Sequence, residues 1–395
     1  MAVNELEALS SLSITINEKE PSGVAEIHVT TKEIVNEDSE QPATNEVLPE
    51  LSPPKKTVAY LGDYIEACHY NSGFTYQKNV PIFNDGDGHY RPQLKQGRVN
   101  RILFYPGVFN PPHRSHQAMV NCAFAGCQDL NVIAAIVLPL GDIIMYREYT
   151  QYASFMSDER MRLWRGDNGP HDWLWVYDTW SGFWMEFRPK LIEAVEKDGF
   201  ELEFVFLGGP DHIGKDRVTH IPWDCPNMVV SDIGRKADFV KDDGTLHDLA
   251  GYETWQTPDF PEETRFKEAK DMPPWLIKSL ADSMSVEKSD PEFLEKLHRE
   301  YTRRMDGTRT CMAGPDLEDM WVRFIPAGEN PIRVSATDIR RIIGETETEG
   351  LFGALKDLAM NPEILVGMME ESRRPWSGPD QECLEEEESA PTDKS

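Results

Sequence analysis

The sequence predicts an α/β fold in which a doubly wound parallel sheet carries helices on its faces. Short apolar segments with strand character alternate with helix-forming segments, and this alternation is typical of strands that run in parallel. The segments that follow three of the strands also carry histidine, aspartate or serine, which are residue types that bind ligands. Because ligands of such sheets bind outside the carboxyl ends of the strands, we expect the functional site at that edge.

The elements can be placed in chain order from their apolar patterns. They are the strand Ile102–Tyr105, a helix near His116–Gly126, the strand Val132–Leu138, helices near Ser157–Arg165 and Phe187–Lys197, and the strands Glu203–Leu207, Asn227–Val230 and Trp321–Ile325. A later helix begins at about Ser335, and we expect residues 351–369 to form one closing helix against the core. Between about residues 232 and 319 the alternation stops, and one clear helix, Pro291–Tyr301, predicts a largely helical insertion.

The two ends of the chain differ from this core in composition. Residues 1–56 are rich in Glu, Ser, Pro and Thr and have little periodicity, which predicts a disordered tail. Residues 57–99 hold several aromatic side chains, and we expect an ordered arm packed on the core. The acidic stretch 371–395 is typical of a solvated, disordered tail. The globular domain is therefore predicted over residues 100–370.

Net charge and cysteine content argue against several classes of function. The chain of 395 residues has a formal net charge of −29, which disfavours a nucleic-acid partner or an anionic membrane, because both attract clustered Lys and Arg. Six cysteines without a C-x-x-C pair indicate free thiols. The N-terminus lacks the pattern of a signal peptide, and no apolar run reaches the roughly 18 residues that span a bilayer. We expect a soluble, intracellular protein of the cytoplasm or nucleus.

The first predicted strand leads into a turn and then into two histidines at the start of a helix. Gly107, Phe109 and Asn110 form the turn, and His113 and His116 follow it. Such an arrangement points backbone N–H groups and the positive end of the helix dipole at one place, which suits a phosphate group. A histidine pair with this spacing is also found as metal ligands and as ordinary polar packing, although the H-E-x-x-H pattern of metal hydrolases is absent here.

A second segment with the same character lies far downstream, after the strand Trp321–Ile325. Ser335 stands at the N-cap position of a helix, and Thr337 and Arg340 fall in its first two turns. The free N–H groups of the first turn, the two hydroxyls and the guanidinium suit phosphate oxygens. Taken alone, the segment is better explained as a capped amphipathic helix, because capped helices are far commoner than phosphate sites.

Together the two segments resemble the signatures of the nucleotidyltransferase superfamily, H-x-G-H and I-S-x-T-x-I-R. Here these signatures stand as His113-Arg114-Ser115-His116 and as residues 334–340, Val-Ser-Ala-Thr-Asp-Ile-Arg. Their order and separation are similar to those of the superfamily, and Ser115 replaces its glycine. The resemblance implies a Rossmann-like nucleotidyltransferase fold.

Three further places resemble the NMN/NaMN adenylyltransferase branch of this superfamily. The strand that leads to Gly209 and Asp211 is similar to the family's strand and G-A-D turn, which implies that both residues face the mononucleotide. Trp180 resembles a tryptophan that stacks on the nicotinamide ring, with Ser181 in place of the family's glutamate. Arg147 is the basic residue nearest to the place of a family lysine that binds phosphate. Without the resemblance, a strand-end turn and a buried aromatic side chain explain Asp211 and Trp180.

The resemblance implies a reaction in which the 5′-phosphate of a mononucleotide attacks the α-phosphate of ATP and pyrophosphate leaves. His113, His116 and Arg340 would stabilise the reacting phosphates, and Mg²⁺ would enter with ATP, held largely by triphosphate oxygens and water. The alternatives are a cytidylyltransferase, whose Arg-Thr-x-Gly lead is absent before Ser335, and a non-catalytic nucleotide-binding relative. The choice between NMN and NaMN, a homo-oligomeric state, and the role of the insertion as a lid, an oligomer contact or a solvated helix stay open.

Overall fold

The computed structural model describes residues 57–70, 82–83, 90–141, 154–166, 172–218, 223–284, 289–315, 320–328 and 331–373. All of them belong to one compact unit that begins at Lys56. The predicted tail 1–56 and nearly all of the predicted acidic tail 371–395 lie outside the described residues. Among the helices that are described, none has both the length and the apolar character needed to cross a membrane.

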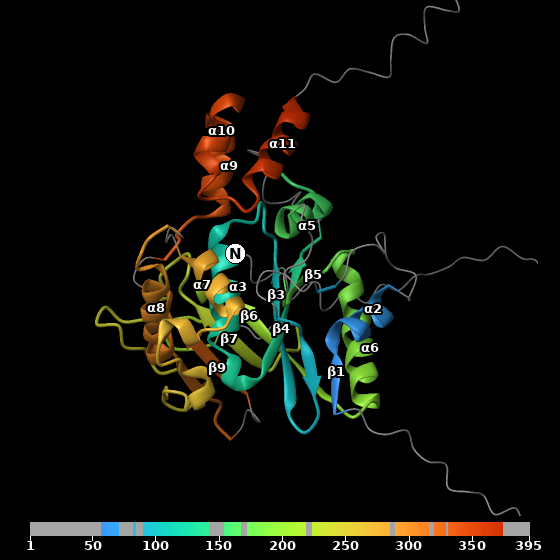
Figure 1. Cartoon of the computed structure of the whole chain (residues 1–395), viewed down its shortest axis with the longest axis vertical. Coiled ribbons are helices and arrows are strands. Elements are labelled where there is room, and N and C mark those ends of the chain that lie inside the picture. Colours follow the sequence, from blue (N-terminus) through green and yellow to red (C-terminus); the bar gives the residue numbers. More distant parts are fainter. Residues whose placement is uncertain are drawn as a thin grey trace, which may run out of the picture. The chain divides into compact units, whose positions relative to one another are not determined.

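A seven-stranded sheet forms the centre of the described unit (Figure 1). Its strands are β3 Val99–Gly107, β4 Val132–Pro139, β5 Leu174–Val176, β6 Glu201–Gly208, β7 Asn227–Ser231, β8 Arg309–Met312 and β9 Trp321–Ile325. They lie in the order β5-β4-β3-β6-β7-β9-β8, and every neighbouring pair is parallel except β8 and β9. The direction of winding reverses between β3 and β6, which is where doubly wound sheets open a crevice at their carboxyl edge. The predicted α/β class is confirmed.

Two strands of this sheet are absent from the sequence prediction, and one of them corrects it. β5 and β8 have only three and four residues, too few to show a periodic pattern. β8 lies inside the predicted insertion and runs antiparallel to β9, so the sheet is not wholly parallel. The connection through residues 313–320 explains this direction, because a parallel pair needs a crossover of a dozen or more residues.

Helices cover both faces of the sheet. They are α2 Leu61–His69, α3 Arg114–Ala125, α5 Ser157–Arg165, α6 Trp184–Lys197, α7 Pro274–Ser283, α8 Phe293–Gly307, α9 Ala336–Glu345, α10 Thr348–Leu355 and α11 Pro362–Arg373. Of these, α9, α10 and α11 gather beyond the end of the sheet with an apolar cluster of their own (Figure 1). Alternate residues of β3 point to opposite faces: Ile102 and Phe104 pack with α6, whereas Leu103 and Tyr105 pack with α3. Figure 1 shows α3 and α6 on opposite sides of the central strands. The core therefore has two layers, one on each face of the sheet.

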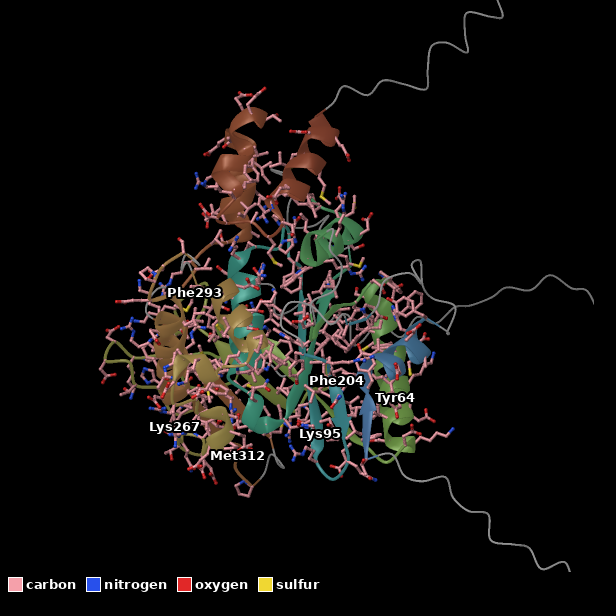
Figure 2. The ribbon with its side chains drawn as sticks, in the orientation of Figure 1. Tyr64, Lys95, Phe204, Lys267, Phe293 and Met312 are labelled. Atoms are coloured by element: carbon pink, nitrogen blue, oxygen red, sulfur yellow. The ribbon has the colours of Figure 1, made fainter. Side chains whose placement is uncertain are left out.

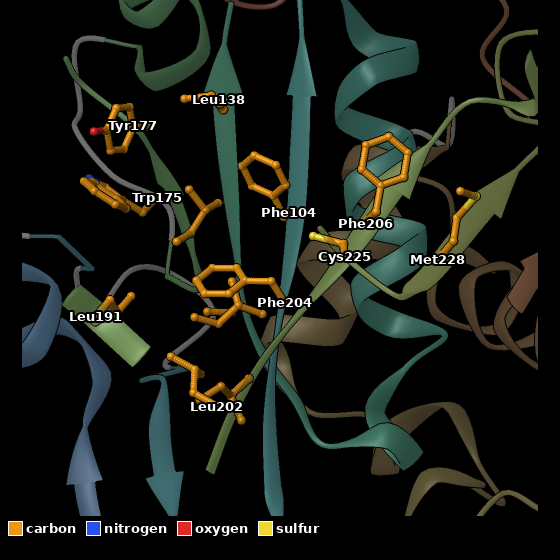
Figure 3. Packing of buried hydrophobic residues seen from close by; sticks show 14 of the residues in the cluster. Phe104, Leu138, Trp175, Tyr177, Leu191, Leu202, Phe204, Phe206, Cys225 and Met228 are labelled. Carbon is orange, nitrogen blue, oxygen red and sulfur yellow. The ribbon is translucent and has the colours of Figure 1, made fainter. Parts of the chain in front are cut away.

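The layer under α6 is rich in aromatic rings (Figure 3). Phe187, Leu191 and Val195 recur every four residues along α6 and are all buried, which is the pattern of one apolar helix face. Trp184, at the start of the same helix, stacks on Phe104 with 4.2 Å between ring centroids. This packing fixes the central strand β3, whose carboxyl end leads into the predicted site.

The carboxyl-terminal part differs from the prediction. Residues 351–369 do not form one closing helix: α10 ends at Leu355 and α11 begins at Pro362. Pro362 explains the break, because its ring disfavours helical backbone in the preceding residue, and Asn361 has a left-handed φ of 45°. The insertion also holds a second helix, α7, which packs directly on α3. The insertion is therefore part of the layer that covers α3.

The described part of the predicted arm packs against α6. A short strand, β1 Val58–Tyr60, pairs antiparallel with β2 Gln93–Lys95, and α2 follows β1 directly. α2 lies along α6, and the Tyr64 hydroxyl donates a hydrogen bond to Asp198 at the end of that helix at 2.5 Å (Figure 2).

Candidate functional site

The turn after β3 is built around a glycine and an inward-folded phenylalanine. A side chain at Gly107 would lie 2.6 Å from the ring of Phe109, so only glycine leaves room for this ring. Phe109 has a left-handed φ of 49°, and its ring meets those of Tyr105 and His116 edge-on at centroid distances of 5.0 and 4.9 Å. The turn therefore forms an apolar base under the start of α3.

The two histidines are stacked on each other at that helix start. Their ring centroids are 3.6 Å apart, and the backbone N–H of His113 donates to Nδ1 of His116 at 3.3 Å. Burial lowers the pKa of His113 to about 3, and burial together with the neighbouring His113 ring lowers the pKa of His116 well below 6.5. Both rings are therefore neutral near pH 7. Because Nδ1 of His116 accepts a hydrogen bond, its Nε2 carries the proton and can donate it to a ligand.

Two buried polar atoms beside these rings have no partner among the described residues. They are Nδ1 of His113 and Nδ2 of Asn110, whose residues are only 5% and 2% exposed. Buried polar atoms usually have a hydrogen-bond partner, so such orphans mark a place where a ligand or water binds. The Oδ1 atom of the Asn110 amide accepts from the Phe155 N–H at 3.0 Å, which fixes the side-chain orientation.

The start of α9 carries the second predicted motif and is closed by a capping box. The Ser335 hydroxyl accepts from the Asp338 N–H at 3.1 Å, and the Asp338 carboxylate accepts from the Ser335 hydroxyl at 2.7 Å and the Ser335 N–H at 3.1 Å. These bonds from Ser335 hold the pKa of Asp338 below its usual value. The helix is therefore capped, as the alternative interpretation requires, and a phosphate bound there would have to displace the Asp338 carboxylate.

Arg340 joins the two motifs. Its side chain is buried, Nη1 donates to the backbone oxygen of Asn110, and Nη2 donates to the Thr337 hydroxyl at 3.0 Å. The guanidinium thus bonds the turn after β3 to the second turn of α9. Thr337 itself is exposed, so its hydroxyl lies at the surface of the same region.

Ser115 joins the same two segments by a second route, which sequence reasoning missed. Its buried hydroxyl donates to the Ile332 oxygen at 2.6 Å and accepts from the Val334 N–H at 3.0 Å. The hydroxyl therefore connects α3 to the segment that enters α9, and a serine in the first turn of a helix gives no sequence signal of that role.

Arg160 is a further residue whose position sequence reasoning did not explain. It is fully buried in α5 and donates to four backbone oxygens: to Val108, to Leu140 at 2.8 Å, to Phe155 at 3.0 Å and to Met156 at 3.3 Å. These oxygens belong to the segments after β3 and β4 and to the approach to α5. Arg160 therefore fixes two neighbouring loops of the carboxyl edge. In the sequence it is one of several charged residues of a helix, and nothing in that pattern indicates that it is buried.

The residues predicted to bind a mononucleotide lie on either side of the histidine turn. Trp180 follows β5 and is 56% exposed, so the interpretation as a buried aromatic is wrong. A side chain at Gly141, after β4, would lie 3.3 Å from Nε1 of Trp180, which shows that the ring reaches the next loop. Asp211 and Gly209 follow β6, and the exposed Asp211 carboxylate pairs with Arg235 at 2.6 Å.

The sheet order brings these loops to one edge. β6 adjoins β3 on one side, and β4 and then β5 lie on the other. With about 4.8 Å between neighbouring strands, the loop of Asp211 starts about 5 Å from the histidine turn and the loop of Trp180 about 10 Å from it. Figure 1 shows α5, α9 and α11 at the end of the sheet toward which β3 and β4 point. Arg147 lies outside the described residues.

The metal-ligand interpretation of the histidine pair finds no further support in the described part of the chain. There, no three side chains of His, Cys, Asp or Glu gather in a way that could hold a metal ion.

Comparisons with known proteins find a distant structural neighbour. No protein-family model and no curated protein matches the chain. Among solved structures, the chain is similar to Plasmodium falciparum nicotinic acid mononucleotide adenylyltransferase complexed with NaAD, with 10% sequence identity and a TM-score of 0.30, over 68% of this chain and 96% of that chain.

Proposed function

We propose that the chain is a nucleotidyltransferase that transfers the adenylyl group of ATP to nicotinamide or nicotinate mononucleotide, with release of pyrophosphate. The observation that supports this proposal is the direct bonding between the starts of α3 and α9. Ser115 and Arg340 each connect the two segments that resemble the superfamily signatures. Two segments more than 200 residues apart in the chain thus present their helix starts to one region.

The start of α3 supplies the groups for the transferred phosphate. Nε2–H of the neutral His116 and the orphan nitrogen of His113 lie at the first turn of α3, where the Arg114 N–H donates to the Leu358 oxygen and the His116 N–H to the His113 oxygen, each at 2.9 Å. Hydrogen bonds from preorganised donors stabilise the charge that develops on phosphate oxygens as the mononucleotide attacks in line. The mononucleotide phosphate is the nucleophile, so these residues bind and orient rather than form a covalent bond.

We assign the pyrophosphate end to α9 and the mononucleotide to the two flanking loops. Thr337 and Arg340 face the leaving phosphates after the Asp338 carboxylate has turned away from Ser335, and Arg147 is proposed to add positive charge. The exposed ring of Trp180 offers a stacking surface for a pyridine ring, and Asp211 offers acceptors for ribose hydroxyls. Mg²⁺ enters as part of the MgATP substrate, where it neutralises triphosphate charge.

The test is pyrophosphate release by the purified full chain with Mg²⁺ and ATP, offered NMN, NaMN or a panel of alcohol phosphates, with CTP in a parallel series. We expect release that requires ATP together with NMN or NaMN. CTP dependence would instead establish a cytidylyltransferase, and ATP binding without release would indicate a non-catalytic relative.

His116→Ala should lower turnover about 100-fold, the usual effect of removing one preorganised donor. His298→Ala is the matched control, because His298 bonds the Phe266 oxygen within the insertion and has no place in the proposed site. Unchanged turnover in His116→Ala would show that the phosphate role is wrong.

A further inference from the structure

The carboxylate of Asp178 is held by residues from two helices just before the loop that carries Trp180. His69 Nε2 donates to Oδ1 at 2.6 Å, and the Tyr70 hydroxyl donates to Oδ2 at 2.8 Å, both from the end of α2. Arg165, the last residue of α5, lies 3.2 Å from Oδ2. The Asp178 side chain is only 7% exposed. Burial opposes its ionisation, but the bonds from His69 and the charge of Arg165 hold the pKa of Asp178 below its usual value.

The end of α2 is itself firmly anchored in the core. His69 is 2% exposed, and its ring contacts those of Trp175, Tyr177 and Phe187 at centroid distances of 5.0 to 5.4 Å. Trp175 and Tyr177 belong to β5 and the residue after it, so α2 packs on the same strand whose loop it bonds. The position of Asp178 is thus set by the arm, not only by its own strand.

Trp180, two residues further along, is far less enclosed. More than half of its surface is exposed, its ring rests on Gly182, where a side chain would come within 2.3 Å of it, and it meets the Phe183 ring edge-on at a centroid distance of 5.4 Å. Gly182 and Phe183 belong to the same loop, so the direction of the ring depends on the backbone on either side. Upstream, that backbone is fixed by the buried Thr179 and by Asp178, which the end of α2 holds.

We propose that residues 57–70 are a positioning arm for the mononucleotide: by holding Asp178, His69 and Tyr70 set the direction of the Trp180 ring. The inference rests on the proposed function, since it assigns the pyridine ring of that substrate to Trp180. His69 and Tyr70 touch no substrate and act through Asp178. Loss of the arm contacts should therefore weaken use of the mononucleotide and leave use of ATP unchanged.

The chain offers a matched pair of substitutions for this test. Tyr70→Phe and Tyr64→Phe each remove one hydroxyl of the arm that donates to an aspartate. Tyr70 bonds Asp178, whereas Tyr64 bonds Asp198 at the far end of α6. If the arm were merely structural, both substitutions would change the KM for the mononucleotide alike. If it is a positioning arm, only Tyr70→Phe raises that KM.

Steady-state pyrophosphate release by the full chain should separate these cases. We expect His69→Leu to raise the KM for the mononucleotide about tenfold and Tyr70→Phe about fivefold, because each removes a hydrogen bond to a charged group. The KM for ATP should stay within about twofold of the wild type, as should both constants in Tyr64→Phe. His69→Gln should recover most of the loss, because its amide N–H can take the place of Nε2. Equal rises for both substrates, or no rise in His69→Leu, would overturn the proposal.

Hydrogen exchange followed by mass spectrometry tests the arm without activity. In His69→Leu, amides of residues 177–183 should exchange faster than in the wild type, and in Tyr64→Phe they should not. Unchanged exchange would refute the positioning role even in an active enzyme. Wild-type inactivity with every mononucleotide would refute the proposed function and the substrate assignment with it, and the exchange result would then decide only whether the arm holds the loop.

Discussion

Removing the Ser115 hydroxyl should loosen the connection between the two motifs. In Ser115→Ala, the Ile332 oxygen and the Val334 N–H lose their shared partner. A buried polar group without a partner costs about 1–3 kcal/mol. Val334 is buried, whereas Ile332 is partly reached by water, so we expect about 2–3 kcal/mol lower free energy of unfolding in total. The substitution adds no atoms and creates no steric conflict.

Urea unfolding of the full chain measures this loss, and Ser283→Ala is the matched control. Ser283 is also buried, but its hydroxyl bonds the Ser279 oxygen four residues back within α7 and the thiol of Cys122, a weak partner, so it does not join the two motifs. We expect less than about 1 kcal/mol from the control. The KM for ATP should rise in Ser115→Ala only, because α9 is then less well held against α3.

Ser115→Gly sharpens the test, because glycine removes the hydroxyl and the β-carbon as well. It should be less stable than Ser115→Ala by about 0.5–1 kcal/mol, since glycine has more conformational freedom to lose in a helix. If Ser115→Ala unfolds at the same urea concentration as the wild type and keeps its KM for ATP, the connection through Ser115 between the two motifs does not exist in solution.

Three further predictions concern the histidine turn, the exposed ring and the buried guanidinium. Burial lowers the pKa of His113 to about 3 in the folded chain. As the pH falls below about 6.5, His113 is therefore protonated in the unfolded chain but still neutral in the folded one. Stability from this group is therefore complete above pH 6.5 and is lost toward pH 3; His113→Gln should flatten the slope of unfolding free energy between pH 7 and 5, and an unchanged slope would contradict a neutral buried ring. Trp180→Ala should raise the KM for the mononucleotide about fivefold to tenfold and change stability by less than about 0.5 kcal/mol; equal losses for ATP would remove the stacking role. Arg340→Ala should raise the KM for ATP at least about tenfold and lower stability, because the Asn110 oxygen loses its donor, and Arg340→Lys should recover little of either. If Arg340→Ala lowers stability but leaves the KM for ATP unchanged, Arg340 only stabilises the capped helix and does not bind ATP.

Much of the fold follows from local patterns. β4 is predicted because its apolar, β-branched run is typical of a strand buried on both faces, and all its residues are buried. α5 is found at the predicted residues, because its charges and apolar side chains keep a helical period. β5, β8 and the break at Pro362 are not predicted, since three or four residues carry no period and the periodic pattern runs on beyond the break.

The candidate site likewise has residues that the sequence predicts and residues that it does not. The histidine turn and the start of α9 are evident in the sequence because glycine, proline and helix-capping residues mark where a strand ends and a helix begins. The roles of Ser115, Arg160 and the pair His69 and Asp178 are not evident, because each depends on a partner distant in the sequence. Asp178 and His69, for example, are more than 100 residues apart and bond through a single pair of atoms.

By itself, the sequence determined the order of the main strands and helices and the type of residue that follows each strand, because these depend on side-chain periodicity and on local backbone preferences. Only the tertiary structure decided that Ser115 and Arg340 tie two distant helix starts together, that Trp180 is exposed, and that the arm reaches Asp178. Contacts of this kind form when whole elements pack, so they depend on the position of elements and not on the residues next to each partner.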